Sequence, residues 1–124
     1  YLWDAYTTTD LFPHANAFSP AELGQGSGLG GRPFNYIRNS VKVTVDAYDG
    51  TTTLYVADPA DPLIRAWQGV FPDLFRPISE LPEDLAAHIR VPEEGFNVQT
   101  RMFGRYHVTN PATFFSSAVS DGTR

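Results

Sequence analysis

The 124-residue sequence predicts an α+β fold in which a small antiparallel sheet packs against three or four short helices. Two observations predict this class. Residues 36–57 contain two β-rich runs around Asp49-Gly50, and the second half of the chain carries amphipathic patterns that begin at a cap residue followed by proline. Apolar residues make up 42% of the chain, which is enough for one core, so we expect a single domain over residues 1–124.

The N-terminal third begins with one strand and continues as a loop. Residues 1–9 are aromatic and β-branched, which favours a strand. Residues 10–34 predict a long irregular loop, because prolines and glycines interrupt every helix and strand pattern there. Its composition favours a tolerated insertion over a functional loop. Tyr1 stands where an initiator Met would, so we expect a fragment of a larger protein.

A hairpin over residues 36–57 is the strongest local prediction. Asp49-Gly50 suits a two-residue type I′ turn, in which both residues need positive φ. With that turn Val45 faces Leu54, and slipping the register by one residue would destroy the match of apolar partners. One face is then apolar, with Val41, Val43, Val45, Ala47, Leu54 and Val56. The other holds Lys42, Thr44, Asp46, Tyr48, Thr51, Thr53 and Tyr55, and is interpreted as a solvated face rather than a contact surface.

The second half of the chain predicts the helices. Asp61-Pro62 begins a helix that ends at Pro72 and carries an apolar stripe wide enough to cover the sheet. That stripe is Leu63, Ile64, Trp67, Val70 and Phe71. Three further helices are expected: one from about Pro82 to Pro92, one over 93–106 and one from Asn110-Pro111 to about Phe115. The core candidates of the second are Phe96, Met102, Phe103 and Tyr106. The tail over 116–124 is expected to fray.

Charge and cysteine content exclude several classes of function. The formal net charge is −5 and the chain has one lysine, which argues against binding nucleic acid. The absence of cysteine excludes disulfides, thiol catalysis and thiolate metal sites. No apolar run in the sequence approaches the ~18 residues of a membrane span.

Two motifs could indicate a bound cofactor or metal, and neither has the required context. Gly26, Gly28 and Gly31 satisfy G-x-G-x-x-G, but prolines flank the motif instead of a leading strand and a following helix. The three histidines are His14, His88 and His107, and no two have metal-ligand spacing. His88 is interpreted as a surface ion pair with Asp84. We therefore expect neither a cofactor site nor a metal site.

Carboxylates are the remaining candidates for catalysis. Those considered are Asp58, Asp61, Glu80, Glu83, Asp84, Glu93 and Glu94. Most of them lie at cap positions or in first helical turns, which is a sufficient structural reason for their presence. We therefore assign no catalytic residue. The alternative is part of an enzyme in which Asp58, Asp61 or Asp84 is completed by residues outside this chain.

Several motifs along the chain together indicate a family. They are DAYTTTD at 4–10, FNYIRNSVK at 34–42, VDAYDGT at 45–51, LPEDL at 81–85 and RYHVTNP at 105–111. With them the sequence resembles uncharacterised protein family 0182, large multi-pass membrane proteins of bacteria, over about residues 1–10 and 34–115. Residues 11–33 follow no family pattern. The resemblance implies an extracytoplasmic position for this chain in a protein of the cell membrane, and it brings no catalytic residue.

The function expected on these grounds is a non-catalytic module for scaffolding or for binding a partner or ligand. Its partners would be the rest of its own chain and the membrane portion. A strand at the edge of so small a sheet would be open, which favours pairing with missing chain or with a second copy as a homo-oligomer. The weaker alternative is a small-ligand module, which requires a well-formed apolar pocket.

Overall fold

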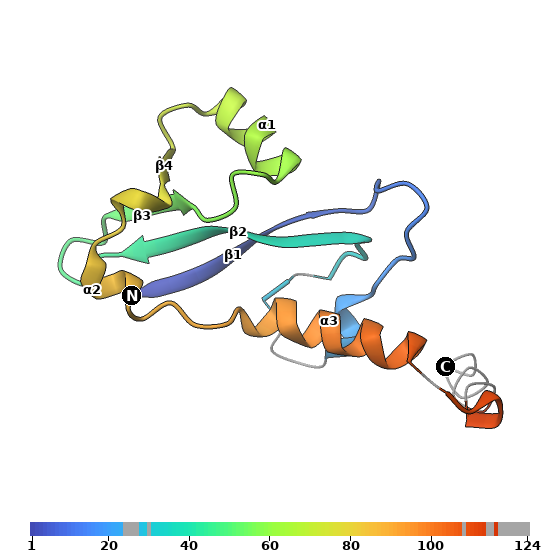
Figure 1. The fold of residues 1–124 in the computed structure, drawn as a ribbon. Helices are drawn as coiled ribbons and strands as arrows, with labels where there is room; N and C mark the ends of the chain where they lie inside the picture. The colour runs from blue at the N-terminus through green and yellow to red at the C-terminus, as the bar shows by residue number, and fades with distance from the viewer. Residues whose placement is uncertain (24–27, 30, 108, 114–115, 117–124) are drawn as a thin grey trace.

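Figure 1 shows the fold in a computed structural model, which describes residues 1–23, 28–29, 31–107, 109–113 and 116. A four-stranded sheet and short helices confirm the predicted α+β class. Gly26 of the glycine motif and residues 117–124 of the predicted tail lie outside the described residues. Within the described part of the chain, no helix combines the length and the apolar character needed to cross a membrane.

The sheet has the strand order β1-β2-β3-β4 and is mixed rather than wholly antiparallel. Its strands are β1 (Leu2–Thr9), β2 (Tyr36–Val45), β3 (Thr52–Val56) and β4 (Phe75–Pro77). The first three pair antiparallel, whereas β4 runs parallel to β3. A parallel neighbour needs a crossover, and the helix α1 (Pro62–Val70) provides it. The antiparallel strands β1, β2 and β3 confirm the predicted sheet, whereas β4 was not predicted, because three residues are too few to form a recognisable strand pattern.

The β2–β3 hairpin has a register that differs by two residues from the predicted one. Val41 lies opposite Val56, and Val43 lies opposite Leu54. The numbers of facing residues therefore sum to 97 (41 + 56), not to 99. A shift of two residues leaves every side chain on the same face of the sheet, whereas a shift of one would invert them all. The predicted division into faces therefore survives an incorrect register.

The connection between β2 and β3 explains the shift. The Asp46 carboxylate accepts a hydrogen bond from the N–H of Tyr48 at 2.7 Å, which begins the turn earlier than the sequence predicts. Gly50 has φ +75°, but Asp49 does not have positive φ. The type I′ turn at Asp49-Gly50 is therefore a wrong prediction, since that turn needs positive φ at both residues.

A β-bulge in β2 changes which side chains face α1. Ala5 lies opposite Val41 and Thr7 lies opposite Arg38, so two residues of β2 stand against one of β1. The consecutive residues Ser40 and Val41 are both buried as a result. Ser40 bonds to the N-cap residue of α1, and Val41 packs in the cluster that contains Ile64 of α1.

Helices cover both faces of the sheet. In the view of Figure 1, α1 lies above it, and α2 (Glu83–Ala86) and α3 (Glu93–Tyr106) lie below. The bounds of α1 and α3 agree with the predicted helices. The second predicted helix is wrong in length, because α2 ends at Ala86 rather than near Pro92. Residues 111–113 are helical, and Phe115 lies outside the described residues.

Two hydrophobic clusters form the core. One contains Val41, Val56 and Ile64, between the sheet and α1. The other joins Val98 of α3 to Phe18 and Phe34, which pair backbone to backbone within the long connection. Residues 10–34 thus contribute two buried aromatic rings to the core.

The predicted core and solvated residues are wrong at several positions. Phe96 and Phe103 of α3 are mostly exposed, since Val98 lies on the buried side of this helix. On the face predicted to be solvated, Lys42 and Tyr55 are buried. Lys42 forms an ion pair with Asp4, which neutralises its charge.

Candidate functional site

Asp61 occupies a buried site at the start of α1. Its side chain accepts the N–H of Leu63 at 3.1 Å and so caps the helix, as the sequence predicts. Three hydroxyl groups also donate to its carboxylate: Thr7 and Ser40 to Oδ2, each at 2.5 Å, and Tyr36 to Oδ1 at 2.6 Å. Residues from β1, β2 and α1 therefore meet at one fully buried carboxylate.

The hydrogen bonds keep this buried carboxylate charged. Burial by itself raises the pKa of Asp61, but the hydroxyls of Ser40, Thr7 and Tyr36 and the N–H of Leu63 outweigh it and lower the pKa to about 2. Burial and the bond to Asp61 raise the pKa of Tyr36 to about 12. Asp61 is therefore ionised and Tyr36 neutral over the physiological range, and four donors occupy the carboxylate. This arrangement suits a structural anchor, since all of these donors bind the carboxylate to other parts of the fold.

Asp58 lies in the turn before Asp61 and has a different set of partners. Its Oδ2 atom forms an ion pair with Arg38 at 2.6 Å, and its Oδ1 atom accepts the N–H of Ala60 at 3.0 Å. Both charged side chains are partly exposed. Asp58 therefore caps a turn and ties it to β2, rather than capping a helix as predicted.

Asp84 lies on α2, on the other side of the sheet from α1 (Figure 1). Its backbone carbonyl, not its carboxylate, contacts Nδ1 of His88 at 2.6 Å, so the predicted ion pair between these side chains is wrong. The structure brings Asp58 and Asp61 into one turn and leaves Asp84 apart from them. Among the described residues, no group of three or more potential ligands is arranged to hold a metal ion.

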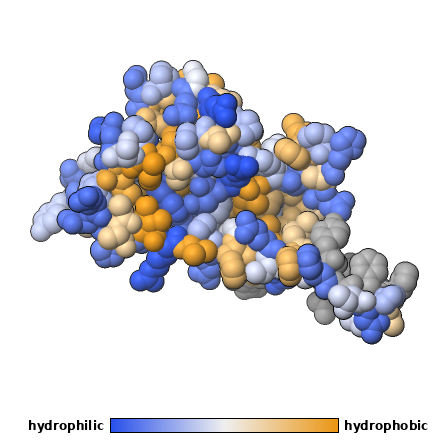
Figure 2. All heavy atoms as spheres, viewed as in Figure 1, coloured by the Kyte–Doolittle hydropathy of each residue, from blue (hydrophilic) through white to orange (hydrophobic). Residues whose placement is uncertain are grey.

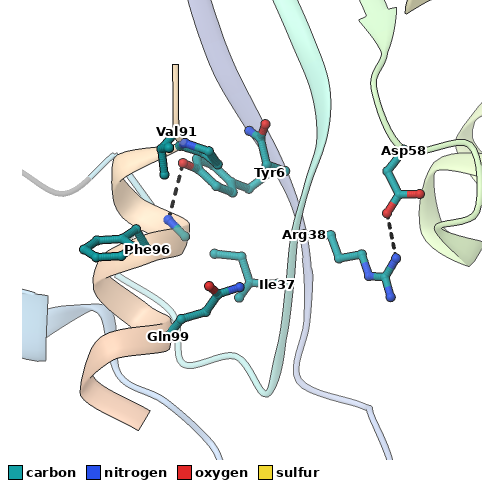
Figure 3. Close-up of a pocket in the computed structure, with 10 residues that line it drawn as sticks. Tyr6, Ile37, Arg38, Asp58, Val91, Phe96 and Gln99 are labelled. Atoms are coloured by element: carbon teal, nitrogen blue, oxygen red, sulfur yellow. Dashed lines mark hydrogen bonds and ion pairs between the residues drawn. The ribbon is translucent and has the colours of Figure 1, made fainter. Parts of the chain in front are cut away.

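A groove of about 420 Å³ lies between the first turn of α3 and the β1–β2 ribbon. Figure 3 shows Tyr6 of β1 and Ile37 of β2 on the side of α3, with Arg38 directed away toward Asp58. The N–H of Gly95 donates to the Tyr6 hydroxyl at 3.4 Å, and burial raises the pKa of Tyr6. The groove wall combines apolar side chains, such as Phe96, with polar ones, such as Gln99. Such a mixed wall suits a non-covalent contact with another polypeptide segment.

Sequence reasoning located Asp61 but not its neighbours. The signal for Asp61 was local, because the cap-plus-proline pair marks a helix start. Thr7 and Tyr36 lie 54 and 25 residues away along the chain, and only the sheet brings them to the helix. Ser40 points toward α1 because of the bulge, and the residue pattern of β2 did not predict this bulge.

The chain matches known proteins over almost its whole length. The model of an uncharacterised protein family, UPF0182, matches residues 1–119. A UPF0182 protein of Micrococcus luteus is 48% identical over 136 residues, which cover 100% of this chain, and one of Desulforamulus reducens is 45% identical over 116 residues, which cover 94%. A third, from Tropheryma whipplei, is 47% identical over 122 residues.

The chain is much shorter than these relatives. It spans 13% of the Micrococcus luteus protein and 11% of the Desulforamulus reducens protein, so it corresponds to a fragment of a larger protein. No solved structure matches it. The family match and the identities together show that this chain belongs to the uncharacterised protein family UPF0182.

Proposed function

We propose that this chain is a non-catalytic docking module, through which a multi-pass membrane protein packs part of its own chain together on the extracytoplasmic side. The observation that carries the docking role is an apolar stripe on α1 that extends beyond the core. The location is supported by the sequence resemblance described above.

The α1 stripe consists of Trp67, Val70, Phe71 and Leu74. Their exposed fractions are 52%, 65%, 46% and 47%, and they lie in the second half of α1 and in the turn over 71–74 that follows it. The rings of Trp67 and Phe71 stack at 5.9 Å. Large apolar side chains gathered at one surface, rather than scattered singly, are typical of a contact site.

The α1 stripe continues the side of the helix that already packs on the sheet. Ile64, one turn before Trp67, is almost fully buried against Val41 and Val56. The first turn of α1 thus covers the sheet, but the prediction that Trp67, Val70 and Phe71 also cover it is wrong, because the rest of the helix extends past the sheet. An amphipathic helix is stabilised chiefly by burial of its apolar side. The exposed apolar side chains of α1 would therefore be buried by a further segment that packs on them.

The rest of the same polypeptide is the partner that the chain length favours. Most of the length of each relative lies outside the region that this chain matches. A tethered segment binds at a high effective concentration, so a modest apolar surface is sufficient.

Amide hydrogen exchange tests the docking role. We expect residues 62–74 to exchange much more slowly in the full-length family protein than in the isolated chain. The double substitution Trp67→Ser and Phe71→Ser should remove that added protection, while Ala66→Ser, an exposed position on the same helix, should retain it. Equal exchange in the full-length protein and the isolated chain would contradict docking through α1.

Thiol labelling in intact cells tests the location. The chain has no cysteine, so Tyr48→Cys would place one thiol in a fully exposed hairpin loop. A membrane-impermeant reagent should label this thiol in intact cells that carry an otherwise cysteine-free full-length protein. Labelling that requires lysis would contradict the extracytoplasmic position.

A further inference from the structure

We propose that β1 accepts an additional β-strand, supplied by another segment of the same full-length protein, in a groove between β1 and residues 88–93. This inference rests on the proposed docking function and adds a second surface, its partner and its mode of binding. The two edges of the sheet differ in a way that points to β1.

Only one edge of the sheet is protected from pairing. The β4 edge has three residues and ends in Pro77, and both features discourage a further strand. The β1 edge has eight residues without proline. In the described part of the chain β1 pairs with β2 alone.

The backbone of β1 presents hydrogen-bonding groups at strand spacing. The backbone N–H of Tyr1 donates to the carbonyl of Val45 at 2.7 Å, and the carbonyl of Tyr1 accepts the N–H of Val45 at 2.9 Å. In an antiparallel ladder such bonded pairs alternate, so Trp3 also directs its backbone groups toward β2. The N–H and C=O groups of Leu2 and Asp4 therefore point away from the sheet. These two N–H donors and two C=O acceptors are spaced two residues apart. The backbone of an extended polypeptide has the same spacing, so it is the partner that matches them.

A groove of about 380 Å³ lies along these groups. The consecutive residues Leu2, Trp3 and Asp4 line one wall, and because their side chains alternate between faces, the groove reaches the strand edge. Lys42 of β2 lines it as well, so the groove continues from this edge onto one face of the sheet. Residues 88–91 and Glu93 line the other wall. Figure 2 shows hydrophobic residues, in orange, at the surface where the chain between α2 and α3 passes below the sheet.

The walls of the groove carry apolar surface beside charged side chains, Arg90 and Glu93 among them. Trp3 is 65% exposed and Val91 73% exposed, which leaves apolar surface on both sides of the edge. A charge on an edge strand ordinarily discourages pairing, but the ion pair with buried Lys42 neutralises Asp4. The edge therefore lacks the usual protection, and its side chains can hold alternate residues of an added strand.

Cross-linking in the full-length protein tests the occupant. A photoreactive benzoylphenylalanine at Val91, in the groove, should form a product within one polypeptide, and mass spectrometry should place it on a segment outside residues 1–124. The same group at Tyr48, in the exposed hairpin loop, is the control and should give no such product. A product between two copies, a product with lipid or no product at Val91 would overturn the proposal.

Proline substitution tests the mode of binding. Leu2→Pro removes an N–H that points away from β2, so the β1–β2 ladder is retained and the cross-link at Val91 should fall by about tenfold. Trp3→Pro removes a ladder bond and should disturb β1 itself. An unchanged cross-link in Leu2→Pro would overturn strand addition. If that occurs while residues 62–74 remain protected in the full-length protein, only this inference fails and docking through α1 stands.

Discussion

The Tyr36 hydroxyl donates a hydrogen bond to Oδ1 of Asp61 at 2.6 Å, and this contact joins the start of β2 to the start of α1. The same carboxylate accepts hydroxyls from Thr7 and Ser40, so one side chain holds two strands and a helix together. Buried carboxylates are costly unless their lone pairs are satisfied, and here four donors satisfy them. We conclude that Asp61 is the main polar anchor of the fold.

Replacing Asp61 should therefore destabilise the chain strongly. We expect Asp61→Ala to lower the free energy of unfolding by about 3 kcal/mol or more, because it removes a helix cap and leaves buried hydroxyls without an acceptor. Urea denaturation followed by circular dichroism would measure it. Asp84→Ala, at an exposed position on α2, should stay within about 0.5 kcal/mol of the parent. Similar losses for the two variants would contradict the anchoring role.

The low pKa of Asp61 predicts a loss of stability in acid. Because the pKa is about 2 in the folded chain and 3.8 as its ordinary value, Asp61 stabilises the fold fully above about pH 4 to 5, and this contribution is lost as the pH falls through the folded pKa. It amounts to about 2 kcal/mol, since one unit of pKa corresponds to about 1.4 kcal/mol. Unfolding free energies of the parent and Asp61→Asn should therefore converge between about pH 5 and pH 2. A constant difference would contradict the lowered pKa.

The register of the β2–β3 hairpin can be tested with cysteine pairs, because the chain has no native cysteine. Val43 lies directly opposite Leu54, so Val43→Cys with Leu54→Cys should oxidise readily to a disulfide. Val43→Cys with Val56→Cys would be opposite in the register predicted from the sequence, but it is diagonal in the structure and should stay reduced. Free-thiol counts after mild oxidation distinguish the two. Preferential oxidation of the second pair would contradict the register of the structure and support the predicted two-residue turn.

The long connection over residues 10–34 should be needed for stability. Phe18 is almost fully buried beside Phe34 and Val98, so Phe18→Ala should cost about 3 kcal/mol through the cavity that it leaves. Phe12, in the same connection, is about half exposed, and Phe12→Ala should cost about 1 kcal/mol or less. Thermal unfolding would compare them. Equal shifts in Tm would show that Phe18 does not belong to the core.

Helix starts and strand faces were predictable because they depend on neighbours in the sequence. The cap-plus-proline pair at Asp61-Pro62 located α1, and the alternation over Val41, Val43 and Val45 identified the apolar side of β2. Local rules failed where two local preferences compete. The Asx turn of Asp46 began the hairpin connection early, and Asp49-Gly50 therefore did not form the expected turn.

The candidate sites were less predictable than the fold. Asp58, Asp61 and Asp84 could be named as carboxylates, but the side-chain partners of Asp58 and Asp61 come from distant positions, as with Arg38 on Asp58. The exposure of Trp67 and Phe71 could not be predicted either, since the sequence pattern of an apolar stripe is the same whether or not the sheet covers that side of the helix.

By itself the sequence determined the class of the fold, the strand over 2–9, the ends of α1 and α3 and the family resemblance, since these follow from contacts a few residues apart or from motifs read directly. The tertiary structure alone decided the bulge at Ser40, the parallel position of β4 and the four donors on Asp61. It also decided which edge is open, because in the described part of the chain β1 pairs with β2 alone. The physical reason is that these features join groups tens of residues apart, and their positions depend on how the layers pack rather than on any local preference.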